Sequence, residues 1–147
     1  MPNVIDKFDG EYFFLSNFYP CDVNYDGMKF RNAEAAFQSA KTVFSIEKST
    51  FTVLDASSAK KLGRQVLLRK DWEQMKDKVM YDVCYAKFSQ NPELLQKLLN
   101  TSDSILIEGN TWGDRIWGIY KGEGENRLGK ILMQIRDELR KEYNNEN

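Results

Sequence analysis

The sequence contains no histidine among its 147 residues. This absence excludes Ser-His-Asp and Cys-His catalysis, helical zinc-protease motifs and ordinary histidine-rich metal sites. Cys21 and Cys84 are the only cysteines, and two distant cysteines by themselves form neither a disulfide framework nor a zinc site. Any acid, base or nucleophile must therefore be a carboxylate, Lys, Tyr, Ser, Thr or Cys. We expect a protein that holds no metal and no cofactor.

The sequence also lacks an excess of charge of either sign. Its 21 basic and 22 acidic residues give a net charge of −1, so we expect no general binding of nucleic acid. No stretch approaches the roughly 20 apolar residues that span a membrane. Residues 1–7 lack the apolar run of a signal peptide. We therefore expect a cytoplasmic protein with no membrane partner.

The length and composition are those of one globular domain. A chain of 147 residues with 41% hydrophobic and 29% charged residues has the size and balance of a single folded unit. We therefore expect one domain over residues 1–147. The polar tail at residues 142–147 is expected to fray.

Local signals predict a hairpin followed by a helix. Asp26-Gly27 is a two-residue turn signal between the strands Asp22–Tyr25 and Met28–Phe30. Asn32 can cap a helix over about Ala33–Phe44. The apolar stripe of this helix would consist of Ala33, Ala36, Phe37, Ala40 and Phe44.

The rest of the chain predicts more helix than strand. Further elements are expected as a helix capped by Asp55 or Ser57 and running to Lys61, a helix capped by Asp71 and running to about Ser89, a helix from Pro92 to Leu99, a strand at Ser104–Ile107 and a helix from about Asn126 to Lys141. The last helix has the clearest amphipathic pattern. The predicted fold class is α+β: compact, mainly helical, with a few short strands.

The helix after Asn32 carries the first group of candidate functional residues. At about 100° per residue, Glu34, Gln38 and Lys41 lie within roughly 60° of one another on the helix surface. They line one edge of the apolar stripe and can form the wall of a cleft. Two simpler interpretations compete with this one: Glu34 stabilises the helix dipole from the first turn, and Lys41 is solvated.

Two loops carry the other candidates. Glu108–Gly118 contains two Trp, two carboxylates and three Gly, a mixture that either binds a planar ligand or forms a tight turn with packed Trp. Gly122–Gly129 precedes the last helix, whose N–H groups can bind a phosphate, with charge added by Lys121 and Arg127. The alternative for this loop is a flexible segment capped by Asn126. The basic residues between Ala59 and Trp72 are interpreted as a solvated face.

Seven segments, taken in order, resemble the NADAR family, also called YbiA-like proteins. They are Phe14–Phe18, Asn32–Lys41, Ala59–Arg64, Leu68–Trp72, Lys87–Asn91, Asp114–Gly118 and Gly124–Met133. Each segment alone is a weak signal, but seven in the family's order are specific. The sequence departs from other members at Ala35-Ala36, where some carry His or Tyr, and at Ile119-Tyr120, where others have Gly.

The resemblance implies a compact α+β domain that hydrolyses N-glycosyl bonds. Associated substrates are ADP-ribose attached to guanine, including guanine in ADP-ribosylated nucleic acid, and phosphoribosylated intermediates of riboflavin synthesis. Together with the spacing arguments, it gives the catalytic candidates Glu34, Lys41 and Asp114. The substrate-binding candidates are Ser16, Asn17, Phe18, Gln38, Trp72, Trp117, Gly118, Asn126 and Arg127.

These residue types can support the implied reaction. Cleavage of a C–N glycosidic bond develops positive charge on the sugar and negative charge on the base, so Glu34 and Asp114 suit the roles of stabilising carboxylate and acid. Lys41 either keeps Glu34 ionised or attacks the aldehyde carbon of the opened sugar, and the resemblance favours attack. The main alternative is a module that binds ADP-ribose, NAD or a related nucleotide without cleaving it. A structural interaction domain would leave the polar group on this helix unexplained.

Overall fold

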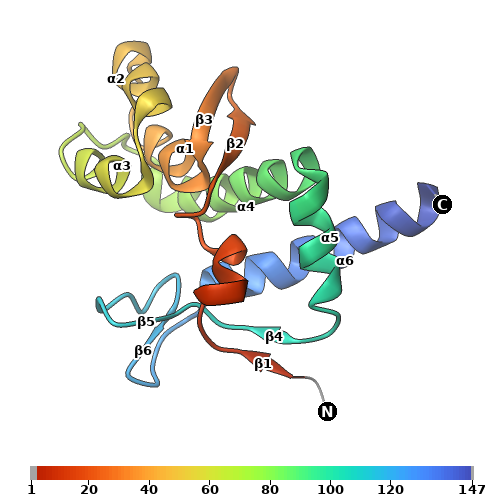
Figure 1. The fold of residues 1–147 in the computed structure, drawn as a ribbon. Coiled ribbons are helices and arrows are strands. Elements are labelled where there is room, and N and C mark those ends of the chain that lie inside the picture. The colour runs from red at the N-terminus through yellow and green to blue at the C-terminus, as the bar shows by residue number, and fades with distance from the viewer. Residues whose placement is uncertain (1–2, 147) are drawn as a thin grey trace. The chain divides into compact units, whose positions relative to one another are not determined.

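A computed structural model describes residues 3–146. The chain forms two compact units, one of which contains the residues up to Ser16 and those from Pro92 onward, while the other spans Asn17–Asn91. Helices dominate both units and the strands are short (Figure 1), which confirms the predicted mainly helical α+β class. No helix in residues 3–146 has the length and apolar run required to cross a bilayer.

The Asn17–Asn91 unit begins with the predicted hairpin. Strands β2 (Pro20–Tyr25) and β3 (Met28–Asn32) pair antiparallel. Asp26 and Gly27 both have positive φ angles, 54° and 76°, as a two-residue turn matched to the strand twist requires. Because β3 leads directly into helix α1, the hairpin places the start of that helix against the core of the unit.

Helix α1 (Ala33–Ser39) starts as predicted, with the Asn32 side chain accepting a hydrogen bond from the Ala35 N–H at 2.7 Å. The helix ends at Ser39, so its predicted extension to Phe44 is wrong. The β-branched Thr42 disfavours continuation, and its hydroxyl accepts a hydrogen bond from the Phe44 N–H at 3.2 Å. Phe44 is 51% exposed and precedes a helix the sequence did not predict, α2 (Ser45–Thr50).

The remaining elements of this unit are η2 (Phe51–Val53), α3 (Ala56–Gly63) and α4 (Trp72–Gln90). Asp55 caps α3 through a 2.8 Å bond from the Ser58 N–H. Asp71 makes no side-chain cap to α4, contrary to prediction, and pairs with Arg69.

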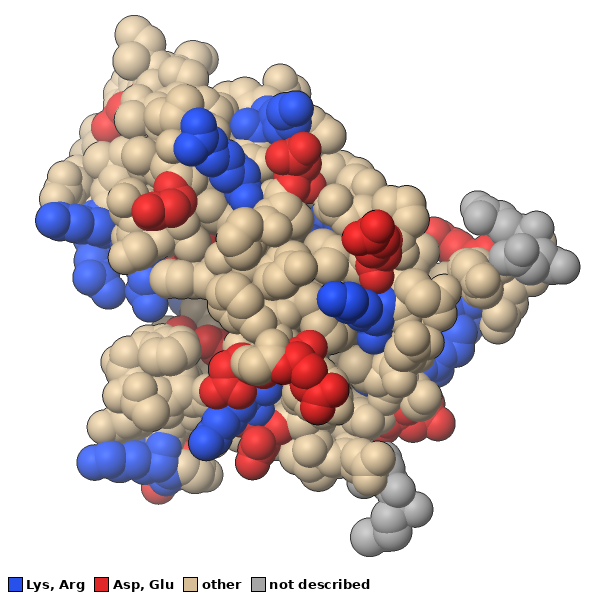
Figure 2. Space-filling view, viewed as in Figure 1, with Lys and Arg blue, Asp and Glu red and all other residues tan. Residues whose placement is uncertain are grey.

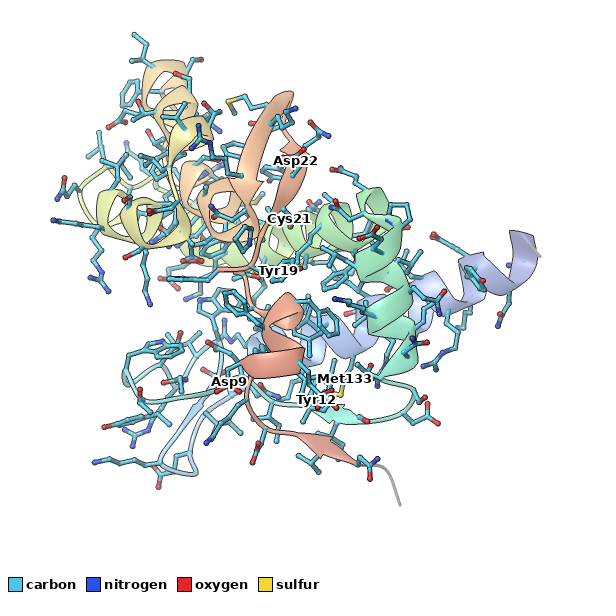
Figure 3. The ribbon with its side chains drawn as sticks, in the orientation of Figure 1. Asp9, Tyr12, Tyr19, Cys21, Asp22 and Met133 are labelled. Atoms are coloured by element: carbon cyan, nitrogen blue, oxygen red, sulfur yellow. The ribbon has the colours of Figure 1, made fainter. Side chains whose placement is uncertain are left out.

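A fully buried lysine lies where α4 packs on β2. The Nζ of Lys87 is 5.7 Å from the ring centroid of Tyr19 and 5.0 Å from that of Phe88. Figure 3 labels Tyr19, which directly precedes β2, and Cys21, which lies within β2. Burial lowers the pKa of Lys87 to about 8, because removal from water disfavours the ammonium.

The other unit contains two pairs of parallel strands. Its elements are β1 (Val4–Ile5), η1 (Gly10–Leu15), α5 (Pro92–Asn100), β4 (Ile105–Leu106), β5 (Gly109–Asn110), β6 (Ile119–Tyr120) and α6 (Arg127–Glu146). β1 pairs with β4, and β5 pairs with β6. Helix α6 buries Leu128, Leu132, Ile135 and Leu139, as its pattern predicts. It continues to Glu146, so residues 142–146 are helical in the structure, and fraying of this tail stays a prediction; Asn147 lies outside the described residues.

Candidate active site

Helix α1 presents a buried carboxylate that is held by its own helix. Glu34 is 8% exposed and Gln38 is 4% exposed. The Nε2 of Gln38 donates a hydrogen bond to the Oε1 of Glu34 at 3.0 Å, one helical turn away. The Glu34 N–H donates to the Asn17 carbonyl at 3.0 Å, which fixes the start of the helix. The carboxylate of Glu34 is therefore positioned by side-chain and main-chain contacts.

Lys41 lies just beyond the end of α1 and remains within electrostatic range of Glu34. Its N–H donates to the Gln38 carbonyl at 3.1 Å, and its carbonyl accepts from the Arg69 N–H at 2.7 Å. The pKa of Lys41 is lowered, mainly by burial and further by the cations Arg64 and Lys60, while Glu34 acts in the opposite direction. The structure thus places Gln38 within hydrogen-bond distance and Lys41 within electrostatic range of Glu34, and the lowered pKa shifts Lys41 toward the neutral amine that a nucleophilic lysine needs.

The aromatic candidates in this unit differ in their availability to a ligand. Trp72 is 6% exposed and packs edge-to-face with Phe37 at 5.2 Å, with the Lys41 Nζ 6.0 Å from its ring centroid. Trp72 is therefore largely a core residue. Phe18 is half-buried, with the Lys60 Nζ 5.8 Å from its ring centroid. Of the two rings, Phe18 is better suited to stack on a substrate base.

Asn17 has a side chain committed to the core of this unit. It is 6% exposed, and its Nδ2 donates to the Sδ of Met80 at 3.2 Å. Its Oδ1 accepts from the Cys84 Sγ at 3.7 Å. These contacts support an anchoring role for Asn17, and its contact with substrate stays a prediction.

Sequence reasoning missed a contribution from the basic residues of α3. Lys60 in α3 and Arg64, the residue that directly follows α3, both lower the pKa of Lys41, although the sequence predicts a solvated face here. Their i, i+4 spacing is the signal that could have shown that they share one side of a helix. Figure 2 shows Lys and Arg side chains gathered over α3, at the left of the view, while charges of both signs are mixed over the rest of that face.

Asp114, in the other unit, has a structural role in its loop. Its Oδ1 accepts hydrogen bonds from the N–H groups of Ile116 at 2.9 Å and Trp117 at 2.8 Å. The Asn110 side chain bonds the main-chain N–H and carbonyl of Asp114. The hydrogen bonds show that Asp114 caps this turn, whereas catalysis by Asp114 stays a prediction.

The remaining candidates near this loop also have local structural explanations. Trp117 is half-buried. A Cβ at the buried Gly118 would overlap the Glu108 carbonyl, so only glycine fits there. Ser16 ends η1, where its N–H donates to the Phe13 carbonyl at 2.9 Å. Substrate binding by these residues stays a prediction.

Two N–H groups at the start of α6 are already hydrogen-bonded within the chain, which disfavours the predicted phosphate site, while substrate binding by Asn126 and Arg127 stays a prediction. The N–H groups of Arg127 and Leu128 donate to the carbonyls of Ile116 and Trp117 at 3.1 and 3.0 Å. The Asn126 side chain bonds the Leu106 carbonyl at 2.9 Å and the Glu108 N–H at 3.0 Å. Arg127 pairs with Glu125 at 3.1 Å. The N–H groups of Arg127 and Leu128 are therefore satisfied within the loop.

We accordingly expect Asn126→Ala to act on stability. The change removes the partners of a buried carbonyl and a partly buried N–H, and it places Ala where Asn126 has a φ of 52°. The free energy of unfolding should fall by about 2–3 kcal/mol in urea titration. Arg127→Ala, which removes a partly exposed ion pair, should cost less than about 1 kcal/mol. If Asn126→Ala instead kept wild-type stability and weakened the binding of a phosphorylated substrate only, that result would support the phosphate prediction.

In residues 3–146 no three His, Cys, Asp or Glu side chains are grouped so that they could hold a metal ion. In the Asn17–Asn91 unit the site candidates are Glu34, Gln38 and Lys41 with the ring of Phe18, and in the other unit they lie in the loop that follows β5.

Comparison with known proteins identifies the family. The NADAR domain profile matches residues 5–140. The N-glycosidase YbiA of Escherichia coli is 38% identical over 131 residues, which cover 85% of this chain and 80% of YbiA. The NMR structure of E. coli YbiA superimposes with a TM-score of 0.87 at 33% identity, covering 97% of this chain and 89% of that one.

A second relative is a much longer protein. A riboflavin biosynthesis protein of Vibrio vulnificus is 36% identical over 135 residues, which are 89% of this chain but 36% of that protein. The chain thus spans about a third of the length of this relative. The chain belongs to the NADAR family, which confirms the resemblance seen in its seven sequence segments.

Proposed function

We propose that the protein hydrolyses the N-glycosidic bond of a nucleotide-like substrate, and that the two units together make one NADAR domain. The observation that carries the catalytic proposal is the buried carboxylate of Glu34, bonded to Gln38 and close to a half-buried Lys41 whose pKa is lowered. Relatives named as N-glycosidases support the reaction type, and a family profile that spans both units supports the domain assignment.

The proposed chemistry uses Lys41 as nucleophile and Glu34 as acid and base. The lone pair of the neutral Lys41 amine forms a bond to C1 of the sugar. The base nitrogen leaves with the electrons of the C–N bond and takes a proton. The C1–O bond of the sugar ring then breaks, and the ring oxygen takes a proton as the lysine nitrogen loses one, which leaves an imine between Lys41 and C1. Water then adds to the resulting imine and releases the sugar and Lys41. Glu34 stabilises the positive charge at C1 and transfers the protons, so the overall change is addition of one water across the bond.

Two classes of substrate fit this chemistry. One is ADP-ribose attached to guanine, either in a nucleoside or in nucleic acid. The other is a phosphoribosylated pyrimidine of riboflavin synthesis, which the name of the Vibrio relative supports. Incubation with ADP-ribosylated guanosine and, separately, with the ribosylated pyrimidine should release free base from at least one, as measured by chromatography. Tight binding of ADP-ribose with no base released from either would favour the binding-module alternative.

Activity should survive removal of metals. The proposed reaction needs only a carboxylate and an amine, and neither requires a Lewis acid. We expect base release to proceed at an unchanged rate after dialysis against EDTA. The control is a parallel sample with each divalent metal restored in turn. Complete loss of activity that one metal restores would contradict the proposed chemistry.

A further inference from the structure

The amide of Gln38 has one end on Glu34 and the other against helix α3. While Nε2 donates to the Glu34 carboxylate at 3.0 Å, the buried Oε1 accepts no N–H or O–H hydrogen bond among the described residues. Oε1 lies against Gly63, because a Cβ added to Gly63 would overlap this oxygen and crowd the amide carbon. The contact is of the weak Cα–H···O type, which leaves the donor end of the amide directed at Glu34.

Gly63 is not required by the backbone. Its φ lies outside the left-handed region where glycine is favoured, and it is the last residue of α3. Alanine is favoured over glycine within helices by about 1 kcal/mol. Alanine is too large for this position. Helix α3 packs on α1, and a methyl group at residue 63 would occupy the volume of the Gln38 amide.

We propose that Gly63 and Gln38 are positioning residues for Glu34. Gly63 leaves the space in which the Gln38 amide lies, and the Gln38 N–H holds the Glu34 carboxylate in its working position. This role rests on the proposed function of Glu34 and replaces the sequence-based assignment of Gln38 to substrate binding. It explains why an amide with both ends directed into the protein is buried beside the proposed catalytic carboxylate.

The test is Gly63→Ala, compared with Ser57→Ala at an exposed position of the same helix. The new methyl group should displace the Gln38 amide and release Glu34. We expect kcat to fall about 10²-fold with little change in KM, because a small misplacement of a catalytic group has that cost. The part of the pH–rate profile that reports ionisation of Glu34 should move to higher pH, since the carboxylate loses a donor that favours its ionised form. Ser57→Ala should match the wild type.

A double-mutant cycle separates positioning from general damage. In a Gln38→Ala background the methyl group at residue 63 has nothing to displace, so Gly63→Ala should then have almost no further effect on kcat. Additive losses would overturn the proposal. If Gly63→Ala fails to fold, Gln38→Ala alone decides: an unchanged kcat and pH profile refutes positioning, and a lowered kcat with the Glu34 ionisation shifted to higher pH supports it. If Glu34→Gln lost all activity while Gln38→Ala kept the wild-type kcat and pH profile, the positioning role of Gly63 and Gln38 would be rejected. The proposed function of Glu34 would still stand.

Discussion

Glu34→Gln is expected to lower kcat by about 10²–10⁴-fold while leaving the fold intact. Glutamine keeps the size of the side chain and can still accept the hydrogen bond from Gln38, so only the ionisable group is lost. Steady-state base release measures the loss, and far-UV circular dichroism with thermal melting checks the fold.

A matched control addresses the simpler interpretation of Glu34. Glu73 occupies the first turn of α4, as Glu34 does in α1, but it is exposed. If Glu34 served only the helix dipole, each substitution by Gln would cost about 0.3–1 kcal/mol of stability and no activity. We expect Glu73→Gln to retain full activity. Full activity of Glu34→Gln on every glycoside tested would instead favour the binding module.

Much of the fold could be predicted because the signals that form its turns and start its helices are local in the sequence. The turn at Asp26-Gly27 and the caps at Asn32 and Asp55 depend on residues within a few positions of each other, and the structure has all three. The end of α1 was harder to predict. Apolar spacing continues to Phe44, but the chain stops the helix with contacts around Thr42, and Phe44 is left half-exposed.

The candidate site shows the same division between local and tertiary information. Spacing placed Glu34 and Gln38 correctly on one helix face, and their bond confirms it. Spacing could not show that the carbonyls of Ile116 and Trp117 occupy the first N–H groups of α6. Nor could it show that Gly63 packs on the Gln38 amide, because a glycine at a helix end is ordinarily interpreted as a stop signal.

Lys41→Ala is expected to lower kcat by about 10²-fold or more. Lys41→Arg should lower kcat by a similar factor. Arginine stays protonated, so it can replace a positive charge but cannot form an imine. The two variants therefore separate the two roles open to Lys41. A lysine that only keeps Glu34 ionised should tolerate Arg in part, whereas a nucleophilic lysine should not. Lys61→Arg, at an exposed position of α3, is the control and should be fully active.

The lowered pKa of Lys41 predicts the direction of the pH dependence. Burial, together with Arg64 and Lys60, moves the pKa below the ordinary lysine value of 10.5. The neutral amine therefore becomes available at lower pH, and kcat should rise with pH through this lowered pKa. Arg64→Gln removes one of the cations, so it should raise the pKa of Lys41 and move the rising limb to higher pH. An unmoved limb would show that Lys41 does not titrate in the rate-determining step.

Chemical trapping gives the most direct evidence for a covalent step. Borohydride added during turnover should reduce the imine to a stable secondary amine. Mass spectrometry should then find the added sugar on the peptide that contains Lys41, and no adduct should form in Lys41→Arg or without substrate. If Lys41→Arg is active and no adduct appears in the wild type, the covalent mechanism is wrong. The carboxylate of Glu34 would then have to stabilise the charged sugar while water attacks C1 directly, and Lys41 would serve only as a nearby positive charge.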